Sequence, residues 1–149
     1  VTMTVHSEEH SIFVFADPKR IMQVLENLIS NSIKYGRENG NTDIYIHDLD
    51  EQFLIEISDN GHGMSSEVLA QIYQPFFTTK PAGKGTGLGL SVSIGIVQDH
   101  KGKIYVESQV GKGTTFFIDI PRVGSVASQA EAAPVPRPIT SSDVKSKSD

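Results

Sequence analysis

Apolar and polar residues alternate with two different periods along residues 1–122, which predicts a mixture of strands and helices. A two-residue period is typical of a half-buried strand, and a period near 3.6 is typical of a helix with one apolar face. The two-residue period predicts two short strands within residues 2–16 around a turn at residues 7–10. It also predicts paired strands at residues 42–48 and 53–58, and two closing strands near residues 103–107 and 114–120.

The longest predicted helix begins at Asp17-Pro18. Asp17 is a good N-cap residue, and Pro18 suits the first helical position, where no backbone N–H is needed. The helix is expected to end near Tyr35, because Gly36 is a usual stop signal. Further helices are predicted from Ser65 to about Tyr73 and from about Leu88 to His100.

The order of these elements suits an α+β domain, in which one mixed sheet is covered by helices on one face. A chain of 149 residues suits a single core. We predict that residues 1–122 form this domain. Residues 123–149 are rich in Ser, Ala, Pro and Val without an apolar period, and we predict a disordered tail or linker there.

Composition excludes several classes of function. The formal net charge of −5 gives no basic face for nucleic acid, and the absence of cysteine excludes disulfides, thiol catalysis and zinc–thiolate sites. No apolar run approaches the roughly 18 residues of a membrane-spanning helix. The chain opens at Val1 without a signal-peptide pattern. We therefore expect a cytoplasmic segment of a longer protein, and the sequence leaves open whether that protein is a membrane-bound sensor.

The long helix is predicted to carry a polar stripe on the side opposite an apolar one. Asn27, Asn31 and Lys34 recur at spacings of four and three, while the apolar stripe comprises Ile21, Leu25, Leu28, Ile29 and Ile33. Amide oxygens are hard ligands that suit Mg²⁺, and lysine suits phosphate. An ordinary solvated helix face is the alternative interpretation of the same stripe.

A carboxylate follows the apolar face of the strand at residues 53–58. By the two-residue period, Asp59 continues the face of Phe53, Ile55 and Ile57, and glycines follow at Gly61 and Gly63. An ionised carboxylate only accepts hydrogen bonds, so a buried one needs a donor. The amino group of adenine donates, whereas guanine has a carbonyl at that position. A tight turn capped by Asp59 is the alternative.

Two glycine-rich segments follow, at residues 83–90 and 111–116. Glycines allow a backbone to approach a ligand closely, and a helix N-terminus offers free N–H groups to anions. The first segment matches neither the Walker loop nor the dinucleotide fingerprint. In the second, Thr114 lies on the apolar face of its strand, at the edge of a predicted pocket. A flexible connector and an ordinary hairpin are the alternatives.

Together these segments resemble the catalytic domain of protein histidine kinases. The stretches LENLISNSIKYG, DNGHGM, PFFTT, GKGTGLGLSV and GKGTTFFI are similar, in order, to the N box, first glycine box, F box, second glycine box and last glycine box. The resemblance covers about residues 17–120. It implies the Bergerat fold of the GHKL superfamily: a mixed five-stranded sheet with three main helices on one face, and ATP held under a lid. The lid, residues 76–91, is most similar to that of nitrogen-regulation kinases.

The resemblance also implies roles for single residues. Asn31 looks like the main Mg²⁺ ligand, Asn27 helps to hold metal or phosphate, and Lys34 resembles the phosphate-binding lysine. These three are the expected catalytic residues. Tyr35 is similar to the residue beside adenine, and Asp59 to the carboxylate that reads its amino group. The other expected ATP-binding positions are Gly61, Gly63, Met64, Phe76, Phe77, Thr78, Thr79, Lys80, Lys84, Gly85, Thr86, Gly87, Leu88, Gly89, Leu90 and Thr114. His62 is expected to be an exposed loop residue.

One position separates kinases from hydrolases within this superfamily. The ATP hydrolases resemble one another in a Glu four residues before the metal-binding Asn, where it activates water. Here that position is Asn27, and Glu26 lies about 100° away around the helix. We therefore predict slow hydrolysis and a γ-phosphate kept for another acceptor.

No histidine in the chain has the context of the family's phosphoacceptor. We expect the acceptor on an upstream helical dimerisation domain, with a response regulator downstream and this chain monomeric. An ATP-sensing module without phosphotransfer is the alternative function, and a structural interaction domain without a ligand is a third. A nucleotide-dependent rise in melting temperature excludes the third.

Overall fold

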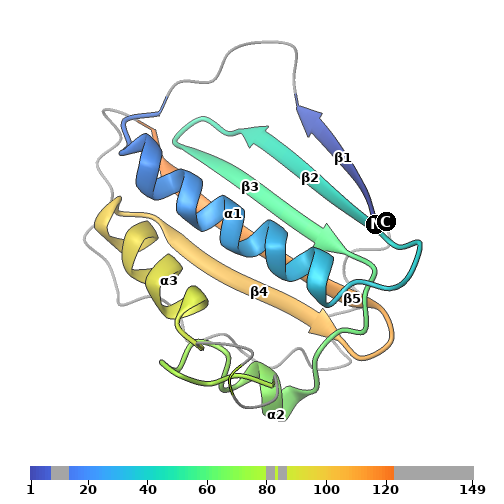
Figure 1. The fold of residues 1–149 in the computed structure, drawn as a ribbon. Coiled ribbons are helices and arrows are strands. Elements are labelled where there is room, and N and C mark those ends of the chain that lie inside the picture. Colours follow the sequence, from blue (N-terminus) through green and yellow to red (C-terminus); the bar gives the residue numbers. More distant parts are fainter. Residues whose placement is uncertain (8–13, 80–82, 84–86, 123–149) are drawn as a thin grey trace.

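A five-stranded mixed sheet forms the centre of the computed structural model, which describes residues 1–7, 14–79, 83 and 87–122 (Figure 1). The strand order is β1-β2-β3-β5-β4, and β1 is parallel to β2 while the other neighbours are antiparallel. The strands are β1 (Thr2–Ser7), β2 (Asn41–Asp48), β3 (Gln52–Asp59), β4 (Lys103–Gln109) and β5 (Gly113–Pro121). This sheet confirms the predicted α+β class.

Two long helices lie side by side over one face of the sheet, α1 (Pro18–Lys34) and α3 (Gly89–Asp99) (Figure 1). The third helix, α2 (Ser66–Leu69), is only a single turn of 4 residues. The predicted continuation to Tyr73 consists of turns instead, with Gln71 N–H donating to Val68 O and Gln74 N–H to Gln71 O. Pro75 disfavours a helical conformation at Gln74, so a regular helix could not extend beyond Tyr73 in any case.

The signals that begin and end α1 act as predicted. The Asp17 side chain accepts from the backbone N–H groups of Lys19 and Arg20, and Pro18 is in the first turn. At the other end, Tyr35 N–H donates to Asn31 O, and Gly36 follows. Local signals therefore set both ends of the helix that carries the polar stripe.

The predicted strand pair within residues 2–16 is only partly right. β1 forms, but it pairs in parallel with β2, from Thr2 opposite Asn41 to Ser7 opposite Ile46. Residues 14–16 are not a strand, and Phe15 is 86% exposed; residues 8–13, with the expected turn, lie outside the described residues. A parallel partner comes from a distant segment, so local alternation alone could not reveal it.

The core lies between the sheet and the two long helices. Val24 and Leu28 of α1 are fully buried, as is Val97 of α3, and they pack against the inner face of the sheet, chiefly Ile57, Phe116, Ile118 and Ile120. Ile33 was predicted on the apolar face of α1, but it is 48% exposed. The buried stripe runs instead through Val24, Leu28 and Ser32, and Ile33 lies about 100° around the helix from Ser32.

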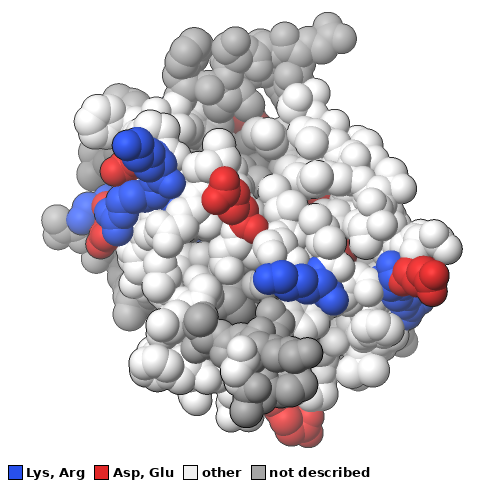
Figure 2. All heavy atoms as spheres, in the orientation of Figure 1, with Lys and Arg blue, Asp and Glu red and all other residues white. Residues whose placement is uncertain are grey.

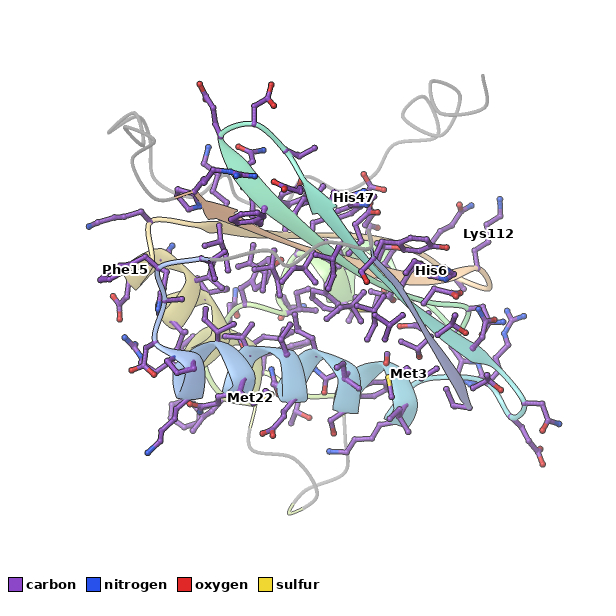
Figure 3. The ribbon with its side chains drawn as sticks, turned by 90° about the horizontal axis from the view of Figure 1, so that it is seen from above. Met3, His6, Phe15, Met22, His47 and Lys112 are labelled. Atoms are coloured by element: carbon purple, nitrogen blue, oxygen red, sulfur yellow. The ribbon has the colours of Figure 1, made fainter. Side chains whose placement is uncertain are left out.

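The opposite face of the sheet carries polar and aromatic pairs (Figure 3). His6 Nε2 lies 3.0 Å from Asp43 Oδ1, and His47 Nε2 lies 2.7 Å from Glu56 Oε2. Tyr45 stacks on the His6 ring with centroids 4.4 Å apart. An antiparallel sheet with one face on the core and one polar face alternates in this way.

Charged side chains are scattered over the helix side of the molecule. Figure 2 shows basic and acidic groups interspersed there, separated by uncharged surface. In the described part of the chain, no helix is both long and apolar enough to cross a membrane.

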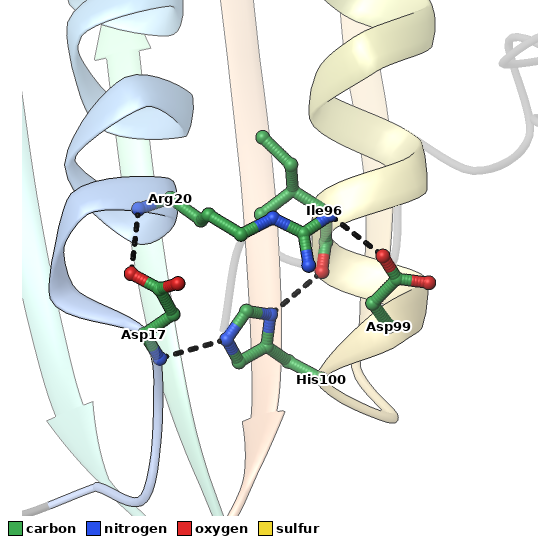
Figure 4. Close-up of polar contacts among 5 residues, drawn as sticks. All are labelled: Asp17, Arg20, Ile96, Asp99 and His100. Carbon is green, nitrogen blue, oxygen red and sulfur yellow. Dashed lines mark hydrogen bonds and ion pairs between the residues drawn. The ribbon is translucent and has the colours of Figure 1, made fainter.

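A histidine joins the start of α1 to the end of α3 (Figure 4). Asp17 N–H donates to His100 Nε2 at 3.0 Å, so His100 Nδ1 must carry the proton and donate to Ile96 O at 2.7 Å. Arg20 adds an ion pair with Asp99 at 2.6 Å, which helps to hold the pKa of that carboxyl below its ordinary value. These contacts tie the start of α1 to the end of α3.

We expect His100→Ala to lower the free energy of unfolding by about 1 to 2 kcal/mol, because two side-chain hydrogen bonds are lost. Denaturant unfolding at neutral pH measures this change. Gln98→Ala is the matched control on the same exposed end of α3, and it should alter stability by less than about 0.5 kcal/mol. Equal losses in the two variants would contradict the joining role of His100.

Candidate functional site

A cavity of about 480 Å³ opens between α1, the start of α3, the end of β3 and the start of β5. Its volume suits a small-molecule ligand. Segments far apart in the sequence line it: Asn27, Asn31, Ser32, Lys34, Tyr35, Asp59, His62, Gly63, Met64, Ser65, Val68, Ile72, Phe77, Thr78, Thr79, Gly87, Gly89, Leu90, Thr114 and Phe116.

The polar stripe of α1 forms one wall of the cavity. Asn27 and Asn31 each precede a residue of the buried stripe, so they lie on the flank of the helix and are half-buried. The sequence pattern predicted Asn27 and Asn31 on the side of the helix opposite the apolar stripe. On that side, their amides would be in contact with water. Lys34 is exposed at the cavity's edge. This wall therefore presents two amides and one cation to any ligand.

The carboxylate of Asp59 lies where β3 ends, directly beyond the buried Ile57. Burial raises the pKa of Asp59, and backbone N–H groups of Gly61 and Thr114 oppose that rise. The Gly61 N–H donates to Asp59 Oδ1 at 2.9 Å. Desolvation is the larger effect, so this carboxylate is suited to a ligand that brings its own donor.

Two glycines close the wall next to Asp59. Gly63 has a φ of +70°, and a Cβ there would lie 1.9 Å from Gln109 O. Gly113 has a φ of +120°, and its Cβ would lie 1.9 Å from Asp59 O. Residues with a Cβ rarely adopt either of these φ values, and at both positions the added Cβ would clash with backbone atoms. The glycine boxes therefore allow two chain segments to pass each other at the edge of the cavity.

A buried hydroxyl network supports the same wall from behind. Ser108 Oγ accepts from Met64 N–H at 2.8 Å and lies 2.8 Å from Thr114 Oγ1. It also donates to Gly113 O at 3.1 Å. Ser108 and Thr114 are each 8% exposed, so water does not replace these bonds easily. The network fixes the loop after β3 onto the β4–β5 hairpin.

The floor of the cavity is apolar, and the sequence predicted only part of it. Phe77, Leu90 and Met64 were expected, whereas Val68, Ile72 and Phe116 were not; Ser32, His62 and Ser65 also line the cavity unpredicted. Val68 and Ile72 lie four residues apart, and that spacing was the available signal. His62 is exposed, as predicted.

Three predicted positions do not line the cavity. Gly61 lies behind Asp59, where a Cβ would meet Tyr35 O at 2.4 Å. Phe76 is 72% exposed, and its backbone packs on Gly87. Leu88 borders a separate groove on the far side of Gly89. Lys80, Lys84, Gly85 and Thr86 lie outside the described residues.

The separate groove lies between α1 and α3, and it also contains Glu26. Glu26 is exposed and does not line the cavity that contains Asp59. No group of three or more His, Asp or Glu side chains able to hold a metal occurs among the described residues. A divalent cation in the cavity would therefore depend on the amides of α1 and on oxygens of the ligand itself.

Residues 16–124 match the family model of histidine kinase-, DNA gyrase B- and HSP90-like ATPases. The chain belongs to this ATPase family. The catalytic domain of histidine kinase ThkA, solved without nucleotide, has a TM-score of 0.72 and 36% identity, over 81% of this chain and 80% of that one. This likeness places the chain among the catalytic domains of histidine kinases, as its motifs predicted.

Curated relatives agree with this placement. Sporulation kinase E of Bacillus subtilis (strain 168) is 41% identical over 109 residues, which are 72% of this chain and 14% of that protein. Sensor histidine kinase ZraS of Escherichia coli (strain K12) is 42% identical over 106 residues, 71% of this chain and 22% of that protein. The histidine kinase domain described here thus spans less than a quarter of each.

We expect Gly63→Ala to lower the free energy of unfolding by about 3 kcal/mol or more, because backbone strain and a backbone clash combine. Gly111→Ala is the matched control: its φ is +81°, but a Cβ there meets nothing within 4 Å. Backbone strain alone should lower the free energy of unfolding of Gly111→Ala by about 1 kcal/mol. Denaturant unfolding measures both, and indistinguishable losses would contradict the close passage at Gly63.

Proposed function

We propose that this domain binds Mg²⁺-ATP and donates the γ-phosphate to a histidine on a separate helical dimerisation domain of the same parent protein. One observation carries the proposal: a single cavity joins the Asp59 carboxylate to the amides of Asn27 and Asn31. A purine nucleotide needs such a site, with an acceptor at one end and groups for metal and phosphate at the other.

Asp59 is the group proposed to read adenine. Burial disfavours its charge, so a ligand amino group that donates to it would relieve that cost. Guanine offers a carbonyl there, which would leave the carboxylate facing an acceptor. Tyr35 lies 42% exposed at the rim and Met64 lines the same end. These side chains would cover the base.

The α1 wall is the proposed phosphate end. Asn31 would hold Mg²⁺ through its amide oxygen, with Asn27 beside it, and Lys34 would bind phosphate. The bound cation would neutralise charge on the phosphates during transfer. Gly87 and Gly89 line the cavity near the start of α3, where backbone N–H groups would be available to the phosphates. Positioning and charge neutralisation are most of what phosphoryl transfer requires from a protein.

The position of Glu26 supports transfer over hydrolysis. Its side chain lies on the exposed side of α1 and borders the other groove, so it cannot activate a water in the nucleotide cavity. In the proposed step, an imidazole nitrogen of the acceptor attacks the γ-phosphorus while the bond to the β-phosphate oxygen breaks. The imidazole becomes a phosphohistidine, its proton leaves to solvent, and ADP departs.

The acceptor and further partners are also part of the proposal. Three of the four histidines among the described residues have a structural explanation: His6 and His47 pair with carboxylates, and His100 joins the helices. The fourth, His62, is exposed on the wall of the cavity. We propose that a response regulator receives the phosphoryl group next, and that this domain alone is monomeric. An ATP-sensing module that binds without transfer is the alternative function, because a site geometry reports binding and not turnover.

We expect Asp59→Asn to weaken ATP binding by roughly 10- to 100-fold, because the new amide faces the adenine amino group with a second donor. Without nucleotide, the variant should melt no lower than the wild type, since burial disfavours the charge it removes. Calorimetric titration with ATP and with GTP tests this, and the wild type should prefer ATP by at least roughly 100-fold. Unchanged ATP affinity in the variant would remove the adenine-reading role.

We expect the chain to transfer labelled γ-phosphate from Mg²⁺-ATP to a histidine of the parent's dimerisation domain supplied in trans. Asn31→Ala should reduce this transfer by roughly 100-fold or more while ATP affinity without Mg²⁺ stays within about threefold, because the metal ligand is lost. Phosphohistidine detection and metal-free titration give the two readouts. Tight ATP binding without any transfer would favour the sensing module instead.

A further inference from the structure

Asn27 is held from outside its own helix, by a serine on α3. Its Nδ2 donates to Ser93 Oγ at 3.1 Å. Ser93 is only 1% exposed, and a hydroxyl buried to that extent needs a hydrogen-bond partner. The contact joins residues 66 positions apart in the chain, one on each of the two helices that border the cavity. The orientation of the Asn27 amide is therefore decided by α3.

Gly89 supplies the space in which this amide lies. A Cβ at Gly89 would be 2.3 Å from Asn27 Oδ1 and 3.0 Å from both Asn27 Cγ and Nδ2. All three amide atoms therefore occupy the volume of a missing side chain. Ser93 follows one helical turn after Gly89 on the same face of α3. The two residues together form a seat for Asn27.

This seat lies on the boundary between the nucleotide cavity and the groove between α1 and α3. Asn27 and Gly89 line both the nucleotide cavity and the groove between α1 and α3, whereas Ser93 lines only the groove. With Nδ2 engaged by Ser93, Oδ1 is the amide atom left for a cation or a donor. Without that bond, the amide could rotate and present either atom to the ligand.

We propose that Ser93 is a positioning residue that orients the Asn27 amide for Mg²⁺-ATP. The proposal rests on the proposed function of the cavity and adds a residue that none of the sequence motifs singled out. A preorganised ligand atom costs less to bind than one that must first be ordered.

The test compares Ser93→Ala with Gln98→Ala. Gln98 is on the same helix, is exposed, and lines neither the nucleotide cavity nor the groove. Titration with ATP should show that Ser93→Ala loses roughly 3- to 10-fold in affinity with Mg²⁺, the value of one hydrogen bond, but less than twofold without it. Gln98→Ala should change both affinities by less than about twofold. Equal losses with and without Mg²⁺ in Ser93→Ala would overturn the proposal.

A double-mutant cycle with Asn27→Ala separates positioning from general packing. If Ser93 acts through Asn27, adding Ser93→Ala to Asn27→Ala should cause no further loss of Mg²⁺-dependent affinity. Additive losses would overturn the proposal, because Ser93 would then act through something else. Thermal melting of each variant without ligand shows whether the fold is retained, and Ser93→Cys provides a second variant if Ser93→Ala melts early.

The outcomes also distinguish this proposal from the proposed function. A Mg²⁺-dependent loss in Asn27→Ala without one in Ser93→Ala would overturn only the role of Ser93. No Mg²⁺-dependent loss of affinity in either variant would overturn both the positioning role of Ser93 and the proposed metal role of Asn27. NMR of the ligand-free protein gives a readout independent of nucleotide: the Asn27 side-chain amide signals should shift in Ser93→Ala and stay unchanged in Gln98→Ala.

Discussion

The packing of α1 on the sheet is the constraint on which the rest of the domain depends. Val24, Leu28 and Ser32 recur every four residues and face the inner side of the sheet, where the first two are fully buried. That stripe fixes the rotation of the helix about its axis. Asn27 and Asn31, each one residue before a buried position, are then held on the flank, half in contact with the protein and half open to the cavity. A different rotation would turn them into water or into the core.

The second long helix converts this flank into a site. α3 lies beside α1 and is tied to it at two levels, by His100 and Asp17 at one end and by Ser93 and Asn27 near the middle of each helix. Glycine at position 89 permits the close approach near the cavity. The same helix pair therefore provides stability and places the start of α3 opposite the amides. Polar contacts between helices are specific in geometry, so they fix a relative position that apolar packing alone would leave less defined.

Asp59 shows how the site sets function against stability. Its carboxylate is desolvated at the end of a core strand, and its pKa is raised as a result. A chain selected for stability alone would place a neutral side chain there. The surrounding glycines and the Ser108 network hold two backbone segments close around it. The carboxylate thus costs free energy in the empty protein, and a complementary ligand that donates to it offsets that cost.

The sequence by itself determined the elements and most of the site. The cap at Asp17, the stop at Gly36, the period of the central strands and the ordered glycine motifs depend on local chemistry, and local chemistry is readable along a chain. Tertiary structure decided the rest: the parallel pairing of β1, the exposure of Ile33, the apolar floor at Val68 and Ile72, and the hydrogen bond from α3 to α1. Those features depend on which distant segments meet and on how far a helix is rotated when they do. Pairwise geometry of that kind is fixed only when the whole core packs.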